Sequence, residues 1–488
     1  MELSSILHFL ENNSILVTGA TGFLAKVLIE KILRVQPNVK KLYLLLRAPD
    51  SNSALHRFNN EVMAKDLFTI VRDKYGDDDL IREKVTLVPG DITLECLGIE
   101  EFGLREEILR QVQVVINLAA TTDFDERYDI AFGINTIGPL NVLNFSRNCS
   151  KLRLFLHVST AYVCGEKEGI VVEKPFKMGD TLNGARGLDI STEKEVIEGK
   201  LKELQAEQQN YISPILKDLG IQRAKKYGWP NTYAFTKAMG EMLLGKWKDK
   251  VPLVIIRPTI ITSTYKEPFP GWLQGLRNID SFVVGYGKGK ISCFPGDPQT
   301  IVDLIPADMV VNAMIVAMVA HADQTTDHAI YHVGSSMANP VLYSSLQDYG
   351  LRYFTEQPWV NKDREPVIVR NGTKLSTEAM VNRYISFHYL IPLKILGVVN
   401  TASCQYFEDA YVDLSRKVKF LMRLVQLFKP YLFFKGVFDD INTEKLRGAV
   451  REIEVEDGIF YFDPRSINWA EYFMYTHIAA VVKYGFKR

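Results

Sequence analysis

The sequence is poor in cysteine and in net charge. Its 488 residues contain only five cysteines, an odd number, and no two of them form a C-x-x-C pair. This usage excludes a disulfide framework and predicts no metal site, and it is typical of reduced thiols in a protein that faces the cytosol. Lys and Arg together number 58, as do Asp and Glu, so no global positive charge draws the chain to nucleic acid.

Leader segments and long apolar runs are also missing. The first residues carry acids where a signal peptide carries bases, and they lack the Arg- and Ser-rich character of a transit peptide. No run reaches the roughly 18 uninterrupted apolar residues of a membrane-spanning helix. The longest candidates are Met309–Ala320, which is too short, and Tyr384–Ala402, which a histidine, a proline and a lysine interrupt. We therefore expect a chain that is soluble or attached to a membrane surface, and neither secreted nor polytopic.

Short β-branched or leucine-rich runs alternate with longer helical patterns over residues 14–160, and one further run follows later. Strands that are buried on both faces have this composition, and their alternation with helices predicts an α/β fold with a parallel, doubly wound sheet. The predicted strands are Ser14–Thr18, Lys41–Leu46, Val85–Val88, Val112–Leu118, Leu152–Val158 and Leu253–Ile256.

Two regions depart from this alternation. Residues 165–230 are rich in Glu, Lys, Gln and Leu, with Ile190–Glu207 as the clearest helical piece. They predict a helical insertion that is either a solvated excursion or a lid over a site. Beyond about residue 370 strand-like runs become rare, so we expect a smaller, mainly helical C-terminal domain. The predicted domains are residues 1–370 and 371–488.

The first predicted strand runs into a glycine-rich turn that opens a helix. Gly19 can take the turn conformation that side chains disfavour, and Gly22 lets a pyrophosphate approach the backbone. The start of the helix then offers free N–H groups and a partial positive charge. With Ala25 as the third small residue, the spacing predicts a dinucleotide site. The cofactor contacts expected here are Thr18, Gly19, Thr21, Gly22, Phe23 and Leu24.

The ends of the next three strands indicate which dinucleotide binds and how. An NAD site places Asp or Glu after the second strand, on the ribose 2′-hydroxyl, whereas this chain has Arg47. A guanidinium suits a 2′-phosphate, so the sequence favours NADP(H). After the third strand, Asp91, followed by Ile92, is expected to accept from the adenine amino group. The fourth strand ends in Asn117-Leu118-Ala119-Ala120, whose small residues are expected to let the cofactor pass.

Tyr233 and Lys237 form a predicted catalytic pair. At i, i+4 on a helix the two side chains share one face. A lysine near a phenol lowers its pKa, so the tyrosine can donate a proton to a carbonyl that is being reduced. The same Y-x-x-x-K spacing occurs at Tyr286 and Tyr431, but the first lies among glycines and the second follows a proline far from the cofactor half.

Two further strand ends complete the predicted site. The fifth strand ends in two hydroxyl residues, and we choose Thr160 over Ser159 to hydrogen-bond the substrate oxygen. The next strand ends in Arg257-Pro258, where a backbone or arginine contact with the cofactor is expected. Cys164 lies close to Thr160, and we interpret it as a small buried thiol.

The glycine loop, the Ser/Thr strand end, Tyr-x-x-x-Lys and Arg-Pro together resemble an extended short-chain dehydrogenase/reductase (SDR), which has a Rossmann fold, over roughly residues 14–320. In more detail the chain resembles the plant alcohol-forming fatty acyl-CoA reductases, and its C-terminal part resembles their male-sterility domain. The segments that carry this closer resemblance are 18–26, 157–166, 228–233, 268–272, 305–309, 331–335, 438–440 and 462–464.

The resemblance implies a long-chain or very-long-chain acyl-CoA substrate, NADPH as hydride donor, and a primary fatty alcohol as product, for wax, cutin or suberin lipids. Hydride attack on the thioester gives a hemithioacetal that expels CoA, and a second NADPH reduces the aldehyde. Tyr233 would protonate the oxygen and Thr160 would hold it. Lys237 would tune Tyr233 and bind the nicotinamide ribose.

Two other functions stay open. A sugar-nucleotide epimerase or dehydratase shares the cofactor constellation, but Arg47 and the Leu- and Phe-rich C-terminal part argue against it. A non-catalytic NADPH sensor would keep the fold for binding alone, and the presence of both Tyr233 and Lys237 argues against that.

A basic, Leu- and Phe-rich stretch, Arg416–Lys435, bears on membrane attachment. A helix of this composition can lie in a lipid interface, although a core-packing helix is the alternative. Because an acyl substrate and an alcohol product both partition into lipid, we expect peripheral attachment to the cytosolic face of the endoplasmic reticulum.

Overall fold

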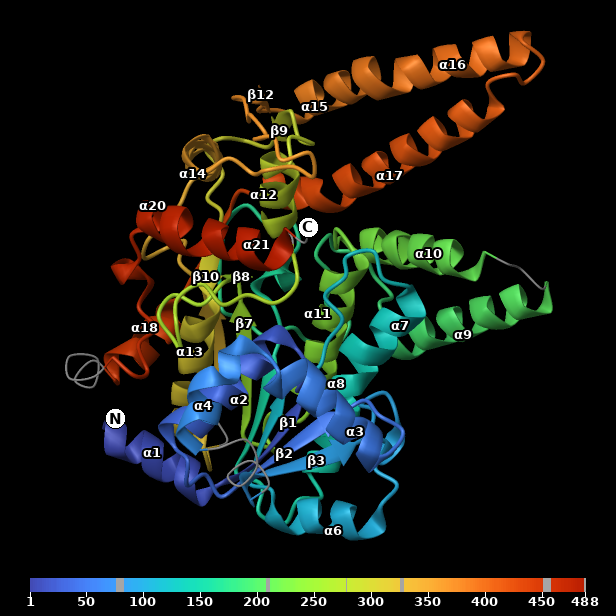
Figure 1. Ribbon diagram of the computed structural model, residues 1–488. Coiled ribbons are helices and arrows are strands. Elements are labelled where there is room, and N and C mark those ends of the chain that lie inside the picture. Colours follow the sequence, from blue (N-terminus) through green and yellow to red (C-terminus); the bar gives the residue numbers. More distant parts are fainter. Residues whose placement is uncertain (76–82, 208–210, 278, 325–328, 451–457, 487–488) are drawn as a thin grey trace.

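A seven-stranded parallel sheet lies at the centre of the molecule (Figure 1). The computed structural model describes residues 1–75, 83–207, 211–277, 279–324, 329–450 and 458–486. The strand order is β11-β7-β5-β4-β1-β2-β3. Its winding reverses between β1 and β4, and open α/β sheets bind ligands at such a point. The strands are β1 (Ser14–Thr18), β2 (Lys41–Leu46), β3 (Val85–Pro89), β4 (Val114–Asn117), β5 (Leu154–Val158), β7 (Leu253–Pro258) and β11 (Ala329–Val333).

The doubly wound parallel sheet expected from the sequence is confirmed. All six predicted strands are present, and their ends lie within two residues of the predicted ones. The seventh strand, β11, is absent from the prediction because its five residues, Ala-Ile-Tyr-His-Val, have no decisive pattern of their own. They form a strand because they pair along β7, from Ala329 opposite Val254 to Val333 opposite Pro258.

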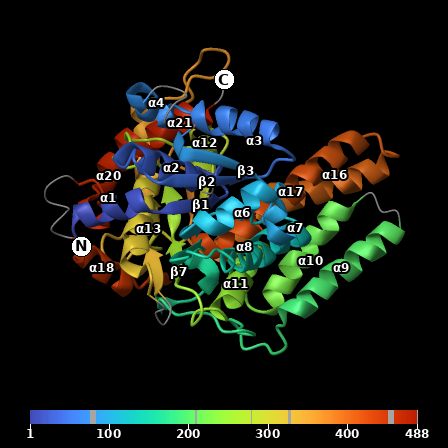
Figure 2. The same cartoon turned by 90° about the horizontal axis from the view of Figure 1, so that it is seen from below.

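Helices cover both faces of the sheet (Figures 1 and 2). One face carries α1 (Leu3–Asn12), α2 (Phe23–Val35) and α13 (Ala307–His321), and the other carries α6 (Phe102–Gln111), α8 (Gly138–Ser146) and α11 (Thr232–Gly245). Successive strand residues point to opposite faces. In β1, Ile15 and Val17 therefore pack with the first layer, whereas Leu16 packs with the second.

Further helices and three pairs of short strands complete the body. The helices are α3 (Ser51–Phe58), α4 (Thr69–Tyr75), α7 (Tyr128–Phe132), α12 (Ile279–Gly287), α14 (Tyr343–Glu356), α18 (Ile441–Gly448), α20 (Trp469–Glu471) and α21 (Ile478–Gly485). The strands form three parallel pairs, which are β8 (Ile260–Thr262) with β10 (Leu304–Pro306), β9 (Cys293–Pro295) with β12 (Thr373–Leu375), and β6 (Gly169–Val171) with β13 (Gly436–Phe438). The division into residues 1–370 and 371–488 stays a prediction, because two of these pairs join one part to the other.

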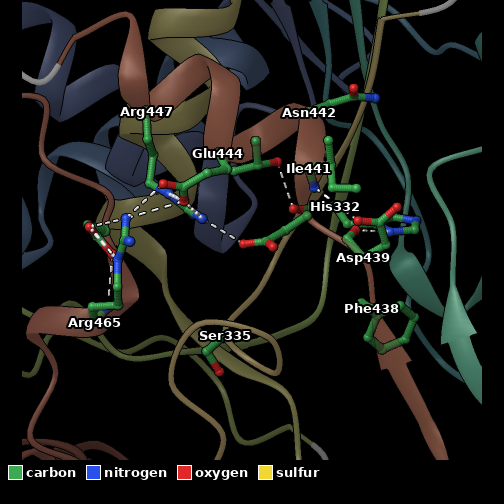
Figure 3. A network of polar contacts seen from close by, with 12 residues as sticks. His332, Ser335, Phe438, Asp439, Ile441, Asn442, Glu444, Arg447 and Arg465 are labelled. Carbon is green, nitrogen blue, oxygen red and sulfur yellow. Dashed lines mark hydrogen bonds and ion pairs between the residues drawn. The ribbon is translucent and has the colours of Figure 1, made fainter.

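Side chains from the C-terminal part cap the open edge of the sheet (Figure 3). The outward backbone groups of the edge strand β11 need partners, since an open edge pairs readily with other chains. The carbonyl of Ile330 accepts from Asn442 Nδ2 at 3.0 Å, and that of His332 accepts from Thr443 Oγ1 at 2.8 Å. The N–H of His332 donates to Glu173 at 2.7 Å. Side chains thus take the place of an eighth strand.

Ion pairs around Arg447 connect α18 to the segment that contains Asp463 and Arg465 (Figure 3). The buried guanidinium pairs with Asp440 and with Glu444, each at 2.6 Å, and Glu444 also pairs with Arg465 at 3.0 Å. Arg465 binds Asp463 at 2.7 Å as well. Asp440 and Asp463 come from the two C-terminal segments that carry the family resemblance, so these segments meet in one cluster.

A long helical hairpin projects from the body (Figure 1). Its first arm joins α15 (Glu378–Ile385), a π-helical turn (Ser386–Leu390) and α16 (Ile391–Ala402), and its second arm is α17 (Glu408–Leu432). Among the described residues, the first arm is the one helix that is long and apolar enough, by length and composition alone, to cross a membrane. Only 11% of its apolar window is buried within the molecule.

His388, Pro392 and Lys394 interrupt the apolar run Tyr384–Ala402, but they do not interrupt the helix. The chain stays helical because Pro392 falls in the first turn of α16, directly after the π-helical turn, where a missing N–H is tolerated. His388 and Lys394 are exposed, so neither side chain is forced into an apolar environment. The first arm is therefore one helical segment, Glu378–Ala402.

The basic stretch Arg416–Lys435 is divided between two environments. In its second half Leu427 and Phe434 are buried, as the core-packing alternative expects, and before them Arg423 forms ion pairs with two carboxylates of the body. In its first half Phe420 is 65% exposed. The first half therefore presents an exposed side at Phe420 and a buried side at Val418.

The predicted helical insertion contains two helices that lie side by side, α9 (Ile190–Ala206) and α10 (Ile212–Lys226). The buried Glu193 on α9 pairs with Arg223 on α10. The helix predicted at Ile190–Glu207 is confirmed. Both views show this pair on the same side of the molecule as the hairpin (Figures 1 and 2).

Candidate active site

The glycine turn between β1 and α2 has the geometry of a dinucleotide loop. Gly19 has φ +69°, and a Cβ there would lie 2.7 Å from the Cα of Ala119, so only glycine fits. Gly22 closes the turn by donating to the Gly19 carbonyl at 2.8 Å, and it begins α2 without a side-chain cap. The free N–H groups of the helix start are therefore available to a phosphate. Phe23 and Leu24 are buried, so a cofactor contact there falls to their N–H groups.

Polar side chains behind the loop hold it in place. Thr18 Oγ1 donates to Asn117 Oδ1 at 2.6 Å and accepts from the two backbone N–H groups that follow Asn117, each at 3.2 Å. Asn117 Nδ2 in turn lies 3.1 Å from Nδ1 of His157 on β5. All three side chains are fully buried, so Thr18 and Asn117 position the loop. Thr21 is the partly exposed side chain of the turn.

Arg47 and Asp91 line one cavity of about 510 Å³ at the ends of β2 and β3. Asp91 is fixed there because its Oδ1 accepts from the N–H of Thr93 at 2.8 Å. A second cation, Arg57, donates to the Arg47 carbonyl at 2.6 Å, but its guanidinium is paired with Glu61 at 2.7 Å. Within the described residues Arg47 has no such partner, so its guanidinium is available for a 2′-phosphate.

Three other residues that are predicted to contact the cofactor instead make contacts within the protein. Ile92 is buried, and its carbonyl accepts from Asn141 Nδ2 at 2.9 Å. Arg257 is buried too, and its Nε donates to Glu241 on α11 at 3.0 Å. Pro258 ends β7 in register with β11. The contacts predicted between these residues and the cofactor stay predictions. Because the Arg257 guanidinium is paired with Glu241, a cofactor contact of Arg257 would come from its backbone.

The three residues predicted to be catalytic come together where α11 meets the end of β5. Asn231 caps α11, because its side chain accepts from a backbone N–H of the first turn at 2.9 Å. Lys237 is buried, and its Nζ donates to the Val158 carbonyl at 2.8 Å. Burial lowers the pKa of Lys237 to about 8. Thr160, two residues beyond Val158, hydrogen-bonds to the phenol of Tyr233.

The surroundings of Tyr233 favour its neutral, proton-donating form. Burial raises the pKa of Tyr233 to about 12, and the Thr160 hydrogen bond and the charge of Arg277 oppose this shift. The sequence predicts that Lys237 lowers this pKa, but the ammonium is directed to the β5 carbonyl, and Arg277 is the cation that acts. Arg277 belongs to no motif and lies in the segment before α12, so no local pattern indicates it.

Of the two hydroxyls at the end of β5, that of Thr160 lines the cavity beside Tyr233. The Oγ1 of Thr160 accepts from the N–H of Tyr162 at 3.3 Å, which fixes its position beside Tyr233. In the described part of the chain, the Oγ of Ser159 is buried without a hydrogen-bond partner. Thr160 is thus the hydroxyl in contact with the phenol, and its predicted hydrogen bond to the substrate oxygen stays a prediction.

A cavity of about 680 Å³ opens beside the predicted catalytic side chains. Its wall combines Tyr233 and Thr160 with Arg277 and with side chains of α17. Tyr431 on α17 accepts from Asn231 Nδ2 at 2.8 Å, and its ring stacks on Phe124 at a centroid distance of 4.9 Å. Through these contacts α17 of the hairpin packs against the start of α11, the helix that carries Tyr233.

A smaller cavity of about 110 Å³ adjoins the first and is lined mainly by apolar side chains. The two cavities share Ile260, Ile279, Phe428 and Tyr431 as lining residues. The second extends to α12 and α14, where its lining residues are Tyr286, Gly350 and Phe354. Tyr286 and Tyr431, the two other Y-x-x-x-K matches, are therefore wall residues of these cavities.

In the part of the chain that the structure describes, neither a reactive thiolate nor a metal site lies beside Tyr233. Burial raises the pKa of Cys164 to about 12, so the thiol stays protonated and is a poor nucleophile. Among the described residues, no group of three His, Cys, Asp or Glu side chains could hold a metal ion. The chemistry that the site offers is a proton donor and a hydroxyl next to a dinucleotide loop, which suits hydride transfer to a carbonyl.

Comparisons with known proteins cover nearly the whole chain. Two family models match, both described as male sterility protein, one for the NAD-binding part over residues 17–314 and one over residues 388–488. The alcohol-forming fatty acyl-CoA reductase of Simmondsia chinensis is 55% identical over 488 residues, which is 99% of each chain. Fatty acyl-CoA reductase 1 of Arabidopsis thaliana is 54% identical over 99% of this chain and 100% of its own.

A solved structure supports the fold. The reductase domain of a nonribosomal peptide synthetase from Mycobacterium tuberculosis aligns with a TM-score of 0.58 and 18% identity, over 99% of this chain and 95% of that one. At this identity the likeness concerns the fold alone. It agrees with the Rossmann-type, extended SDR architecture expected from the sequence.

Proposed function

Because the chain belongs to the family of alcohol-forming fatty acyl-CoA reductases, we propose that a long-chain acyl-CoA is reduced to the primary alcohol in the cavity beside Tyr233. The chain is an oxidoreductase that acts on fatty acyl-CoA with a nicotinamide cofactor. The observation that carries the assignment is the junction of the two cavities, because it places an apolar space next to a proton donor. Burial of an alkyl chain there contributes about 0.8 kcal/mol per CH₂ group.

The residues present fit NADPH as the cofactor. The turn at Gly19 has no room for a Cβ, and the helix start behind it offers uncapped N–H groups for the pyrophosphate. Arg47 and Asp91 would hold the adenosine half, and Lys237 would hold the nicotinamide ribose. When bound, NADPH supplies the hydride.

The side chains of this chain have distinct tasks in the reduction. Tyr233 donates its phenolic proton to the substrate oxygen, and the Thr160 hydroxyl hydrogen-bonds the same oxygen and keeps it beside the phenol. The ammonium of Lys237 is fixed by the Val158 carbonyl, so it stays in place through both reductions. The aromatic wall of Phe124 and Tyr431 excludes water from the reacting carbon.

Product analysis tests this function directly. The purified chain is incubated with palmitoyl- to tetracosanoyl-CoA and NADPH, and the lipids are separated by gas chromatography. We expect a primary alcohol and two NADPH oxidised for each alcohol formed, with none from the Tyr233→Phe variant on the same timescale. NADPH binding without any reduced product would support a sensor instead, and activity on a nucleotide sugar would support an epimerase.

We also propose that the helical hairpin attaches the enzyme peripherally to the cytosolic face of the endoplasmic reticulum. Its outer part exposes apolar side chains, including Ile395 at 59% and Val398 at 71%, a surface that a lipid interface covers better than water. Lys417 and Lys419 lie exposed on the second arm and suit anionic head groups. The attachment would bring the cavity wall formed by α17 close to lipid, where substrate and product partition.

Liposome flotation tests the attachment. At low salt with anionic vesicles, the wild type should float, and a variant with Ile395→Asp and Val398→Asp should stay at the bottom of the gradient. The matched control is Phe102→Asp, because this residue is 66% exposed on α6, at the opposite end of the molecule (Figure 1). Equal flotation of both variants would contradict the role of the hairpin, and fractionation of cells tests the compartment.

A further inference from the structure

Three cations line the catalytic cavity, and they differ in their partners. Lys217 lies 3.6 Å from Asp125, and Arg423 pairs with the same carboxylate at 2.7 Å. Arg277 has no ion pair within the described residues. Its guanidinium is therefore the cation of this cavity that is free to meet an anion.

Arg277 lies between the cofactor loop and the proton donor. Its guanidinium carbon is 4.9 Å from the ring centroid of Phe23, the first residue of α2. On the other side it shares the cavity wall with Tyr233, and its charge lowers the pKa of that phenol. Burial lowers the pKa of Arg277 and the negative charge of Asp280 opposes this shift, but the carboxylate forms no ion pair with the guanidinium in the described structure. It accepts from the backbone N–H of Arg277 at 3.1 Å and lies 3.1 Å from Nε2 of His477.

We propose that Arg277 is a further catalytic residue, whose guanidinium contacts the sulfur of the substrate and stabilises the thiolate as CoA leaves. This inference rests on the proposed function, because only a thioester releases a thiolate. A neighbouring guanidinium lowers the pKa of a thiol, and it thereby makes the thiolate a better leaving group.

The release step balances with residues already in the site. In the hemithioacetal the C–S bond breaks, and its electron pair leaves with the sulfur as CoA thiolate. The C=O bond forms as the hydroxyl proton returns to the phenolate of Tyr233, which gave that proton during hydride addition. The aldehyde that remains has no leaving group, so its reduction needs Tyr233 and Thr160 but not Arg277.

Separate assays of thioester reduction and aldehyde reduction distinguish a role of Arg277 in thiolate release from a structural role. Arg277→Met is assayed with palmitoyl-CoA and with hexadecanal, each with saturating NADPH. We expect kcat for palmitoyl-CoA to fall by about 10²-fold, as for loss of one group that stabilises a developing anion, and kcat for hexadecanal to change by less than about threefold. Arg277→Lys keeps the charge and should recover part of the loss. Lys217→Met, which removes a paired cation of the same cavity, should not change the ratio of the two rates.

A change of leaving group sharpens the test. The palmitoyl thioester of 4-nitrothiophenol releases a thiolate that is stable without help, so the deficit of Arg277→Met relative to wild type should shrink for this substrate. Equal losses with the thioesters and the aldehyde would overturn the proposal in favour of a general effect on Tyr233. An unchanged kcat with a raised KM for NADPH or palmitoyl-CoA would assign Arg277 to a phosphate group instead.

Failure of the proposed function gives a different result. A wild-type enzyme that reduces neither palmitoyl-CoA nor hexadecanal refutes the reductase assignment, whatever the Arg277 variants do. Thermal unfolding and NADPH titration of each variant show whether the fold and the cofactor site are intact. If Arg277→Met does not fold, Arg277→Lys and Arg277→Gln carry the comparison of the two half-reactions.

Discussion

Two apolar helices of this chain have opposite surroundings. In α13 every residue from Ala307 to Met318 is buried, whereas in the hairpin arm the π-helical turn has no buried residue and α16 has only Asn400. Both segments are the longest apolar candidates in the sequence, and their compositions of Val, Ile, Leu and Met are similar. Composition therefore shows that a helix needs an apolar partner, but not where that partner is.

The partners explain the difference. α13 packs against α2 on one side and against β7, β10 and α18 on others, so the chain itself supplies its apolar surroundings. Among the helices and strands of the described chain, α16 packs closely only with the π-helical turn before it and with α17. The residues proposed to carry out the reduction lie in the body, whereas the exposed apolar surface lies on the hairpin. The following experiments test whether these two regions have separate roles.

The largest expected effect is on the proton donor in the body. Tyr233→Phe should reduce turnover by about 10²- to 10⁴-fold, the range for a lost general acid, and leave NADPH binding nearly intact. Lys237→Ala should reduce both, because Lys237 is proposed to bind the nicotinamide ribose as well as to support Tyr233. The hairpin variant Ile395→Asp, assayed in detergent, should keep the wild-type rate. Near-normal turnover of Tyr233→Phe would refute its assignment as proton donor.

A matched pair of isoleucines tests the comparison itself through stability. Ile315 in α13 is fully buried, and Ile315→Ala should lower the free energy of unfolding by about 2–5 kcal/mol. Ile395 in α16 is 59% exposed, so Ile395→Ala should change it by no more than about 0.5 kcal/mol. Urea unfolding followed by tryptophan fluorescence measures both. Similar losses would mean that the hairpin is packed in solution.

Cofactor choice is the next effect in size. A charge-assisted hydrogen bond contributes about 1.5–3 kcal/mol, so Arg47→Ala should weaken NADPH by about one to two decades and leave NADH almost unchanged. Arg47→Asp should go further, because a carboxylate repels the 2′-phosphate and accepts from a ribose hydroxyl. The control is Arg57→Ala, whose guanidinium is already paired with Glu61. If Arg47→Ala keeps its preference in steady-state kinetics, Arg57 is the residue that binds the phosphate.

The small cavity allows a test of chain length where body and hairpin meet. A Cβ at Gly350 would meet only Tyr286, at 3.7 Å, so Gly350→Ala should fit and keep the wild-type preference. Gly350→Leu should fill the cavity and shift kcat/KM toward shorter acyl-CoA by about tenfold, since one methylene in an apolar pocket is worth about 1–3 kcal/mol. An unchanged chain-length profile would show that the alkyl chain takes another path, such as one along the hairpin.

The smallest effect concerns pH. The pKa of Lys237 is lowered by burial to about 8, so its ammonium is lost as pH rises through 8, and kcat/KM should fall on this alkaline side. The phenol of Tyr233, with a pKa of about 12, stays protonated in this range and does not cause the fall. Lys237→Arg should remove the decline between pH 8 and 10 in whatever activity remains. A decline that persists in this variant would belong to another group.

Much of the site could be predicted from the sequence because its signals are local. The glycine turn needs Gly19 at one position next to a strand and a helix, and the i, i+4 spacing brings Tyr233 and Lys237 to one face. Thr160 follows from its place at a strand end, since parallel strands end at one edge of the sheet. Such signals depend on a few consecutive residues, and the same holds for the six predicted strands.

Only the tertiary structure decided which distant residues share a wall. Arg277, Gly350 and Tyr431 come from three separate elements with no common period, and they surround the cavities because the hairpin and α14 pack against the sheet domain. The same packing decides that α13 is buried and that α16 is exposed. The physical reason is that the free energy of apolar burial depends on the area removed from water and not on direction. A run of apolar residues therefore shows that a helix needs an apolar surface to pack against, but only the complete fold determines which surface that is.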